Sequence, residues 1–153
     1  LFEKHNIFTA KEVESRRDIL LDTYAKKINI EALTMVDMAK RDILPAAVAY
    51  EKTVAEAQTA KMTLGFGTRD DAEAKLVKKL TDLIGEVYDG VEALNAQIAG
   101  AKDIGTPLAA AQFTRDGILP AMERLRSAAD ALEVEIGSQY LPYPTYTDLL
   151  FRV

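Results

Sequence analysis

The stretch INIEALTMVDMAKRDILPAAVAY, residues 28–50, decides the fold. Its apolar residues recur at steps of three and four, which places them on one side of an α-helix. This side continues past the stretch and comprises Val36, Ala39, Ile43, Ala46, Ala47, Tyr50, Val54 and Ala57. Pro45 lies in its middle, and proline disturbs a helix because it lacks an N–H group and crowds the carbonyl four residues earlier. We therefore predict a long helix that is bent near Pro45.

The same helix extends in both directions from this stretch. Thr9 and Glu12 have the spacing of a capping box, which marks a helix start. No glycine follows until Gly65, which suits the left-handed position just beyond a helix end. We predict one helix over residues 10–64, and a straight helix of that length would span about 82 Å. A compact bundle has no room for such a rod, which is a second reason to expect a bend.

Two further helices are predicted over residues 69–101 and 106–137. The first has an unusually regular apolar stripe, formed by Val77, Leu80, Ile84, Val87, Val91, Leu94, Ile98 and Ala101. Gly85 and Gly90 lie off this stripe, where they either weaken the helix by up to about 1 kcal/mol each or let another helix approach closely. Thr106 and Pro107 form a clear start for the last helix. Its stripe comprises Leu108, Ala111, Arg115, Ile118, Met122, Leu125, Ala129, Leu132 and Ile136.

These elements predict an all-α protein, an antiparallel up-down-up bundle of three long helices with a much longer first helix bent at Pro45. Residues 1–9 form a lead-in segment, 10–138 the helical bundle, and 139–153 an extended tail, rich in proline and tyrosine, that packs on it. Three helices of these lengths leave about residues 10–33 of the first one unpaired. The tail, a second copy of the chain or a missing part of a larger protein could cover its apolar side chains.

The first and third helices share a short motif. Residues 41–45 read RDILP, and residues 115–120 read RDGILP. Lengths of helices and loops place Pro120 near the level of Pro45, so we predict that the two helices bend together. Arg115 falls on the apolar stripe, where a charge is costly to bury unless it is paired. It either reaches the bundle edge or pairs with a carboxylate, with Asp42 as the first choice.

The composition of the chain argues against several classes of partner and site. The 153 residues have a net charge of −5 with both signs interspersed, which disfavours nucleic acid as a partner. There is no cysteine for a disulfide or thiolate metal site, and no apolar run long enough to cross a membrane. The first residue is Leu1 rather than Met. We expect a cytoplasmic chain that is one domain of a larger protein.

The sequence offers no catalytic, cofactor-binding or metal-binding residue. His5 is the only histidine, no Glu-x-x-His pair exists, and the glycines around Phe66 do not form a phosphate-binding loop. The acidic residues have helical spacing to basic ones, as on a solvated surface. Candidates for structural or interface roles are Pro45, Pro120, Asp42, Arg115, Phe66, Tyr143 and Tyr146.

The central stretch resembles the C-terminal region of the type III glutamine synthetases. The lead-in LFEKHNIFTAKEVESR, residues 1–16, and the ending PTYTDLLFRV, residues 144–153, resemble the same family in the same order. The resemblance implies a parent enzyme that makes glutamine from glutamate, ammonia and ATP with a divalent metal, Mg or Mn. It also implies a homo-oligomer of stacked rings, whose metal, nucleotide and substrate residues lie in a preceding catalytic domain.

No position of this chain matches a catalytic motif of that family. The resemblance therefore implies a non-catalytic helical domain that packs on the catalytic domain of the same polypeptide and helps to build the oligomer. The alternative is a free-standing helical bundle for protein interaction or sensing. The first hypothesis predicts that the apolar side of residues 10–33 is open, whereas a free-standing bundle should cover it. A stand-alone enzyme would need a pocket with converging polar groups.

Overall fold

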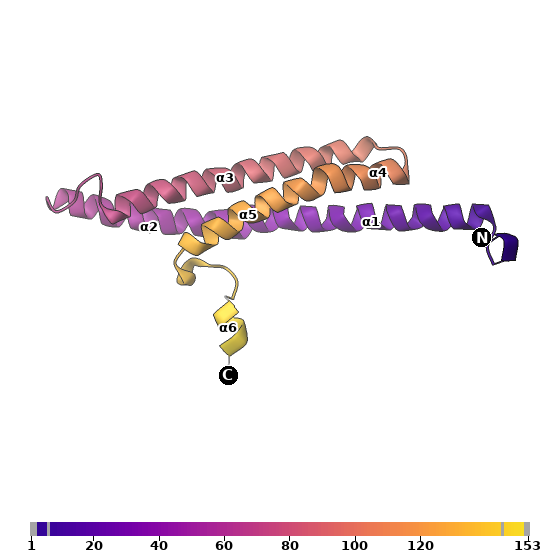
Figure 1. Ribbon diagram of the computed structural model, residues 1–153. Helices are drawn as coiled ribbons and strands as arrows, with labels where there is room; N and C mark the ends of the chain where they lie inside the picture. Colours follow the sequence, from indigo (N-terminus) through magenta and orange to yellow (C-terminus); the bar gives the residue numbers. More distant parts are fainter. Residues whose placement is uncertain (1–2, 6, 145, 152–153) are drawn as a thin grey trace.

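The computed structural model describes residues 3–5, 7–144 and 146–151, with the backbone alone at 146–148. Three helical rods form the bundle: the second runs antiparallel to the first and the third, and the first is the longest (Figure 1). It consists of α1 (Ala10–Met38), the π-helical turn η2 (Ala39–Ile43) and α2 (Leu44–Thr63). The second consists of α3 (Ala72–Gly100) and a last turn, η3 (Ala101–Asp103). The third consists of α4 (Pro107–Phe113), the π-helical turn η4 (Thr114–Ile118) and α5 (Leu119–Glu135). The predicted all-α, up-down-up bundle is confirmed.

In place of the bend predicted at Pro45, the structure has a π-helical turn. In η2 the Leu44 N–H donates to the carbonyl of Ala39, five residues earlier, directly before Pro45. In η4 the Leu119 N–H donates in the same way to Thr114, directly before Pro120. A π-turn carries one residue more than an α-turn and so accommodates the missing N–H of the proline without ending the helix. The shared motif thus has a shared backbone form, and α1 and α2 continue in one line (Figure 1).

The two π-turns do not lie at the same level, which corrects the prediction of a joint bend. Lys40 forms an ion pair with Glu92, and Gly90 faces Leu125. Leu125 therefore lies near the level of η2. Ile118 lies beside Asn29 and Leu33 of α1, so Pro120 lies about 15 Å from Pro45 along the bundle axis. Pro107 lies beside Asp18 and Asp22, so the third rod starts further down α1 than the predicted lengths of helices and loops suggested.

The core lies along α3 and faces the other two rods. The most deeply buried large side chains come from α3, η4 and α5, and are Leu80, Val87, Val91, Leu94, Ile118, Leu125 and Leu132. Gly90 allows the close approach of α3 and α5, because a Cβ there would lie 3.2 Å from the Cα of Leu125. A Cβ at Gly85 would meet nothing within 4 Å, so of these two glycines it is Gly90 that serves helix packing.

The turn between α2 and α3 is closed by a Schellman motif. Gly65 has a φ of 77°, and its N–H donates to Met62 at 3.1 Å. The Phe66 N–H donates to the carbonyl of Lys61 at 3.0 Å, which completes the motif. A Cβ at Gly67 would lie 2.7 Å from the Met62 nitrogen, so this position also requires glycine. The predicted role of Gly65 as a left-handed cap is confirmed.

The tail begins packed on the bundle and ends away from it. It contains η5 (Ser138–Tyr140) and α6 (Tyr146–Phe151), so it is less extended than predicted. The Tyr140 hydroxyl lies 2.9 Å from Thr53 Oγ1, and its ring lies 5.2 Å from that of Tyr50. Figure 1 shows α6 projecting from the bundle. Its side chains at Leu149, Leu150 and Phe151 are exposed, so packing on the bundle is confined to the first part of the tail.

Candidate functional site

The two prolines of the shared motif have a structural role. Pro45 and Pro120 are exposed, and each occupies the first turn of the α-helix that follows a π-turn. Proline is well tolerated at that position because its missing N–H finds no acceptor there in any case. Neither proline contributes a group that could bind a ligand.

Arg115 does not pair with Asp42, contrary to our first choice. Its guanidinium forms two hydrogen bonds to the carboxylate of Asp116, at 2.6 and 2.8 Å, and the side chain is 66% exposed. This carboxylate raises the pKa of Arg115, and Arg115 in turn lowers the pKa of Asp116. The buried position of the stripe belongs to Thr114, whose hydroxyl donates to the Ala110 carbonyl at 2.8 Å. The wider π-turn changes which residue faces inward, and regular helical spacing does not predict this change.

Phe66 lies at the free end of the α2–α3 hairpin and is 82% exposed. The loop around it is well braced. The Gln58 amide donates to the carbonyl of Thr68 at 2.6 Å, and Lys61 forms an ion pair with Glu73. An exposed aromatic ring on a fixed turn fits the predicted contact role, although no described residue of this chain provides a pocket for it.

Tyr143 fixes the first part of the tail to α5. Its hydroxyl donates a hydrogen bond to Glu133, a partner that the sequence analysis did not identify. Burial raises the pKa of Tyr143 well above its ordinary value, and the hydrogen bond and charge of Glu133 raise it further. The charge of Asp42 also raises the pKa of Tyr143, so Asp42 lies near the tail and not beside Arg115. Tyr146 lies in α6, and its side chain lies outside the described residues.

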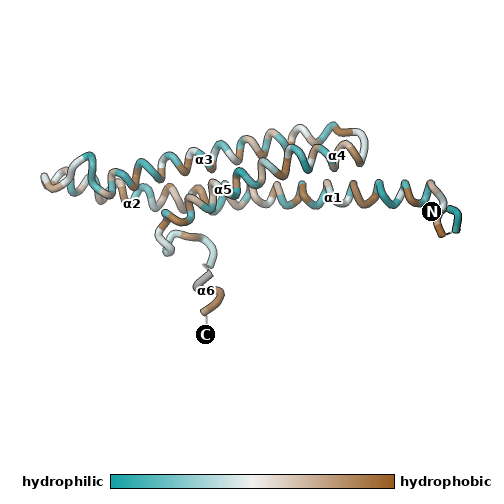
Figure 2. Tube along the Cα trace, in the orientation of Figure 1, coloured by the Kyte–Doolittle hydropathy of each residue, from teal (hydrophilic) through white to brown (hydrophobic). Residues whose placement is uncertain are grey.

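The largest candidate surface is the N-terminal half of α1. Pro107, at the start of α4, lies beside Asp18 and Asp22. The unpaired part of the first rod is therefore shorter than the predicted residues 10–33, but its apolar side chains are open to solvent. Figure 2 shows hydrophobic segments recurring along α1 up to its N-terminal end. The exposed large side chains of α1 are Val13, Ile19, Leu20, Tyr24, Ile30, Leu33 and Met38.

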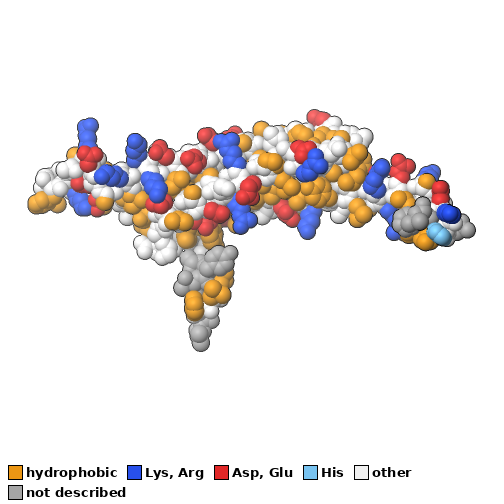
Figure 3. Space-filling model, in the orientation of Figure 1, with side chains coloured by type: hydrophobic (Ala, Val, Ile, Leu, Met, Phe, Trp, Pro, Cys, Tyr) orange, Lys and Arg blue, Asp and Glu red, His pale blue; other side chains and the backbone are white. Residues whose placement is uncertain are grey.

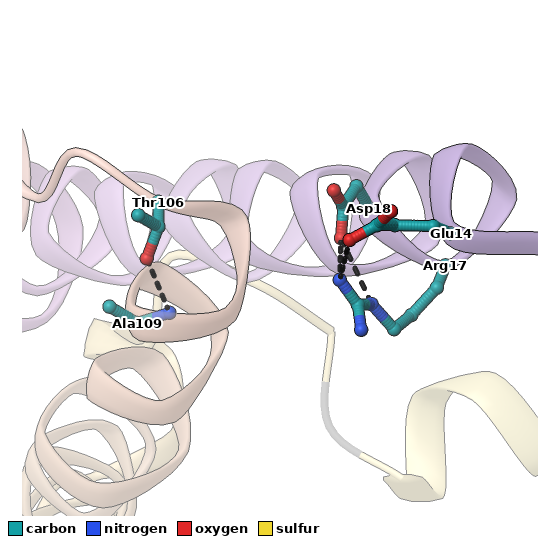
Figure 4. Close-up of polar contacts among 5 residues, drawn as sticks. All are labelled: Glu14, Arg17, Asp18, Thr106 and Ala109. Carbon is teal, nitrogen blue, oxygen red and sulfur yellow. Dashed lines mark hydrogen bonds and ion pairs between the residues drawn. The ribbon is translucent and has the colours of Figure 1, made fainter. Parts of the chain in front are cut away.

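Polar contacts occur on α1 next to this surface and on α4, which lies beside it. Arg17 lies between two carboxylates, 2.8 Å from Asp18 and 3.7 Å from Glu14 (Figure 4). On α4, the Thr106 hydroxyl accepts a hydrogen bond from the Ala109 N–H at 3.3 Å, which confirms the predicted N-cap. Figure 3 shows hydrophobic side chains gathered where α4 lies, and charged side chains of both signs over the rest of that face.

The described residues do not form a metal site or a membrane-spanning helix. Within them, no three His, Cys, Asp or Glu side chains lie close enough together to hold an ion. No described helix combines the length and hydropathy needed to cross a bilayer. The hollows on the surface are shallow, and one of them follows a single exposed side of α2, from Lys52 to Leu64. The residues present therefore do not fit a divalent metal, and we derive no chemical step through one.

Comparison with known proteins gives a consistent result. Residues 1–62 match the family described as the glutamine synthetase C-terminal domain. The whole chain is 36% identical to a glutamine synthetase of Butyrivibrio fibrisolvens, of which it covers 22%. It is 30% identical, over 99% of its length, to a type-3 glutamine synthetase of Dictyostelium discoideum, of which it covers 21%. A glutamine synthetase of Bacteroides fragilis (strain YCH46) is 28% identical over 95% of the chain, which covers 20% of that protein.

The chain spans about a fifth of the length of the curated relatives that it matches. The match falls in their C-terminal part. The three sequence blocks that resembled the type III enzymes therefore agree with an independent match along the entire chain. The chain is thus similar over its entire length to the C-terminal part of glutamine synthetases, one of which is a type-3 enzyme.

Proposed function

We propose that this chain is a non-catalytic helical domain of a glutamine synthetase, which packs on the catalytic domain of the same polypeptide and helps to assemble a cytoplasmic homo-oligomer. The observation that carries the proposal is the match of the whole chain to about a fifth of each relative. The proposed parent reaction joins glutamate and ammonia at the expense of ATP. In this proposal ATP and the divalent metal, Mg or Mn, bind to the catalytic domain and not to this chain.

The structure supports this proposal over a free-standing interaction or sensory bundle. A free-standing bundle should cover the apolar side of its longest helix, but Leu20 is 70% exposed and Ile30 is 65% exposed. Several of the described carboxylates lie in exposed ion pairs with Lys or Arg, such as that of Asp22 with Lys26. Exposed pairs of this kind provide little perturbation of pKa values, which general acid–base chemistry requires.

Truncation of the natural full-length polypeptide tests the proposal. We would measure glutamine formation and particle mass for three samples: the full-length polypeptide, the polypeptide without these 153 residues, and the chain alone. We expect activity and a large assembly for the first, a smaller or less stable particle for the second, and no activity for the third. Turnover by the chain alone would refute the non-catalytic role. A truncated polypeptide with the mass and activity of the full-length one would refute the role in packing and assembly.

A further inference from the structure

The N-terminal half of α1 carries more exposed hydrophobic surface than the outside of a bundle requires. Leu20 is 70% exposed, Ile30 65% and Ile19 61%. Single exposed apolar residues are common on soluble proteins, but a contiguous group marks a surface that contacts something else. Leu20 and Ile19 are adjacent in the N-terminal half of α1, and Ile30 lies further along the same helix.

The exposed residues point to two different sides of the helix. Successive residues of an α-helix turn by about 100°. Val13, Leu20 and Tyr24 therefore share one side, and Ile19 and Ile30 share another, about 100° away. A third side, which carries Ile28 and Ala32, packs on the bundle core. Besides the side that packs on the core, α1 thus exposes apolar side chains on two further sides.

The start of α1 is a formed helix even where the bundle does not cover it. The Thr9 N–H donates to the Glu12 carboxylate at 2.8 Å, and the Glu12 N–H donates to the Thr9 hydroxyl at 3.2 Å. The Ala10 N–H donates to Glu3 of the lead-in at 3.2 Å. The lead-in also folds back so that the guanidinium of Arg16 lies 4.6 Å from the centre of the Phe8 ring. These contacts fix the direction in which the apolar sides are presented.

Neither the tail nor a second copy of the chain suits this surface. Tyr140 and Tyr143 hold the tail beside Thr53 and Glu133, toward the other end of the bundle. A helix side from Val13 to 33 is about 30 Å long and about 10 Å wide, so it offers about 300 Å². A stable contact between free partners buries about 800 Å² on each. A covalently attached partner needs less area, because the tether raises its effective concentration, and a large partner can enclose two sides at once.

We propose that the N-terminal half of α1 is the surface on which the remaining, N-terminal part of the same polypeptide docks, with Leu20 and Ile19 buried in the contact. The inference rests on the proposed function and adds the surface that performs the packing. The size of the partner is supported by the relatives, because about four-fifths of their length lies outside the match. The bundle beyond α1 then projects from the catalytic part as a rod.

Hydrogen exchange of the α1 amides, measured by mass spectrometry, tests this inference. The natural full-length polypeptide is compared with the chain alone, as wild type and with Leu20→Glu. Val134→Glu is the matched control, because Val134 is 82% exposed on α5, away from this surface. We expect amides 13–24 to exchange about 100-fold more slowly in the full-length polypeptide than in the chain alone. Leu20→Glu should remove about tenfold or more of this protection, and Val134→Glu should leave it unchanged.

Internal controls separate loss of docking from loss of folding. The amides of the buried segment 87–94 must stay protected in every variant, and Ile30→Gln provides a second, milder change if Leu20→Glu disturbs the fold. Equal exchange of amides 13–24 in both wild-type samples would overturn the docking surface, while the truncation result for assembly would still decide the proposed function separately. Self-association of the chain alone that Leu20→Glu abolishes would overturn it too, because the partner would then be a second copy.

Discussion

Replacement of Gly90 by alanine tests the close contact between α3 and α5 that organises the core. Both Gly90 and Gly85 lie inside α3, where alanine is favoured over glycine by about 1 kcal/mol. They differ in their surroundings. A Cβ at Gly85 meets nothing within 4 Å, whereas a Cβ at Gly90 lies 3.2 Å from the Leu125 Cα and 3.3 Å from its Cδ1. The pair therefore isolates packing from helix propensity.

The expected magnitudes follow from these distances. Gly85→Ala should raise the free energy of unfolding by about 0.5–1 kcal/mol. At Gly90 the same gain is opposed by overpacking, which costs about 1–3 kcal/mol when the neighbour cannot yield. The Leu125 Cα belongs to the backbone, so relief requires α5 to move away from α3. We expect Gly90→Ala to be neutral or destabilising by up to about 2 kcal/mol.

Urea unfolding followed by far-ultraviolet circular dichroism measures both variants. A change of 1 kcal/mol shifts the melting temperature by about 2–4 °C for a chain of this size, so thermal unfolding provides a second reading. The slope of the free energy against urea should stay constant, which shows that only stability has changed. If Gly90→Ala stabilises the chain as much as Gly85→Ala does, the two helices are not in close contact at Leu125 and the packing described is wrong.

Three further substitutions probe the tail, a helix start and the hairpin tip. Tyr143→Phe should lower the free energy of unfolding by about 1 kcal/mol at neutral pH, because it removes the hydrogen bond to Glu133. Because folding raises the pKa of Tyr143, the stabilisation by its hydroxyl is present below pH 10.0 and is lost as the pH rises further. The difference in unfolding free energy between wild type and Tyr143→Phe should therefore shrink above that pH. Thr106→Ala removes the α4 N-cap and should lower stability by about 1 kcal/mol in urea unfolding, whereas an unchanged midpoint would show that the cap is not formed. Gly67→Ala places a Cβ 2.7 Å from the Met62 nitrogen and should destabilise the tip by about 1–3 kcal/mol, visible as faster hydrogen exchange at 61–68; normal exchange there would contradict the described turn.

Regular helices were predictable because their signals are local. The Thr9–Glu12 box and the Thr106–Pro107 start fix two helix beginnings, and both are formed in the structure. The apolar stripe of α3 agrees with the buried residues, because a period near 3.6 has one orientation that brings them all to the core. These features require no knowledge of how distant segments meet.

The remaining features depend on distant or irregular contacts. A π-turn replaces an i to i−4 bond by an i to i−5 bond, so periodicity alone put Arg115 on the apolar stripe and missed Thr114. The starting level of α4 depends on the path of the chain between α3 and Pro107, which residue spacing does not encode, so Pro120 was predicted too near Pro45. The bond between Tyr143 and Glu133 depends on the path of the tail after α5, which residue spacing does not encode.

Recombination of the two parts of the natural polypeptide tests the central claim most directly. The truncated polypeptide that lacks these 153 residues is mixed with the chain, and sedimentation velocity records whether the two move together. We predict that they co-sediment, because the exposed side of α1 is the docking surface for the remainder of the polypeptide. Independent sedimentation of the two, with the truncated part forming a full-size and fully active assembly by itself, would contradict the assignment of this chain as a packing and assembly domain.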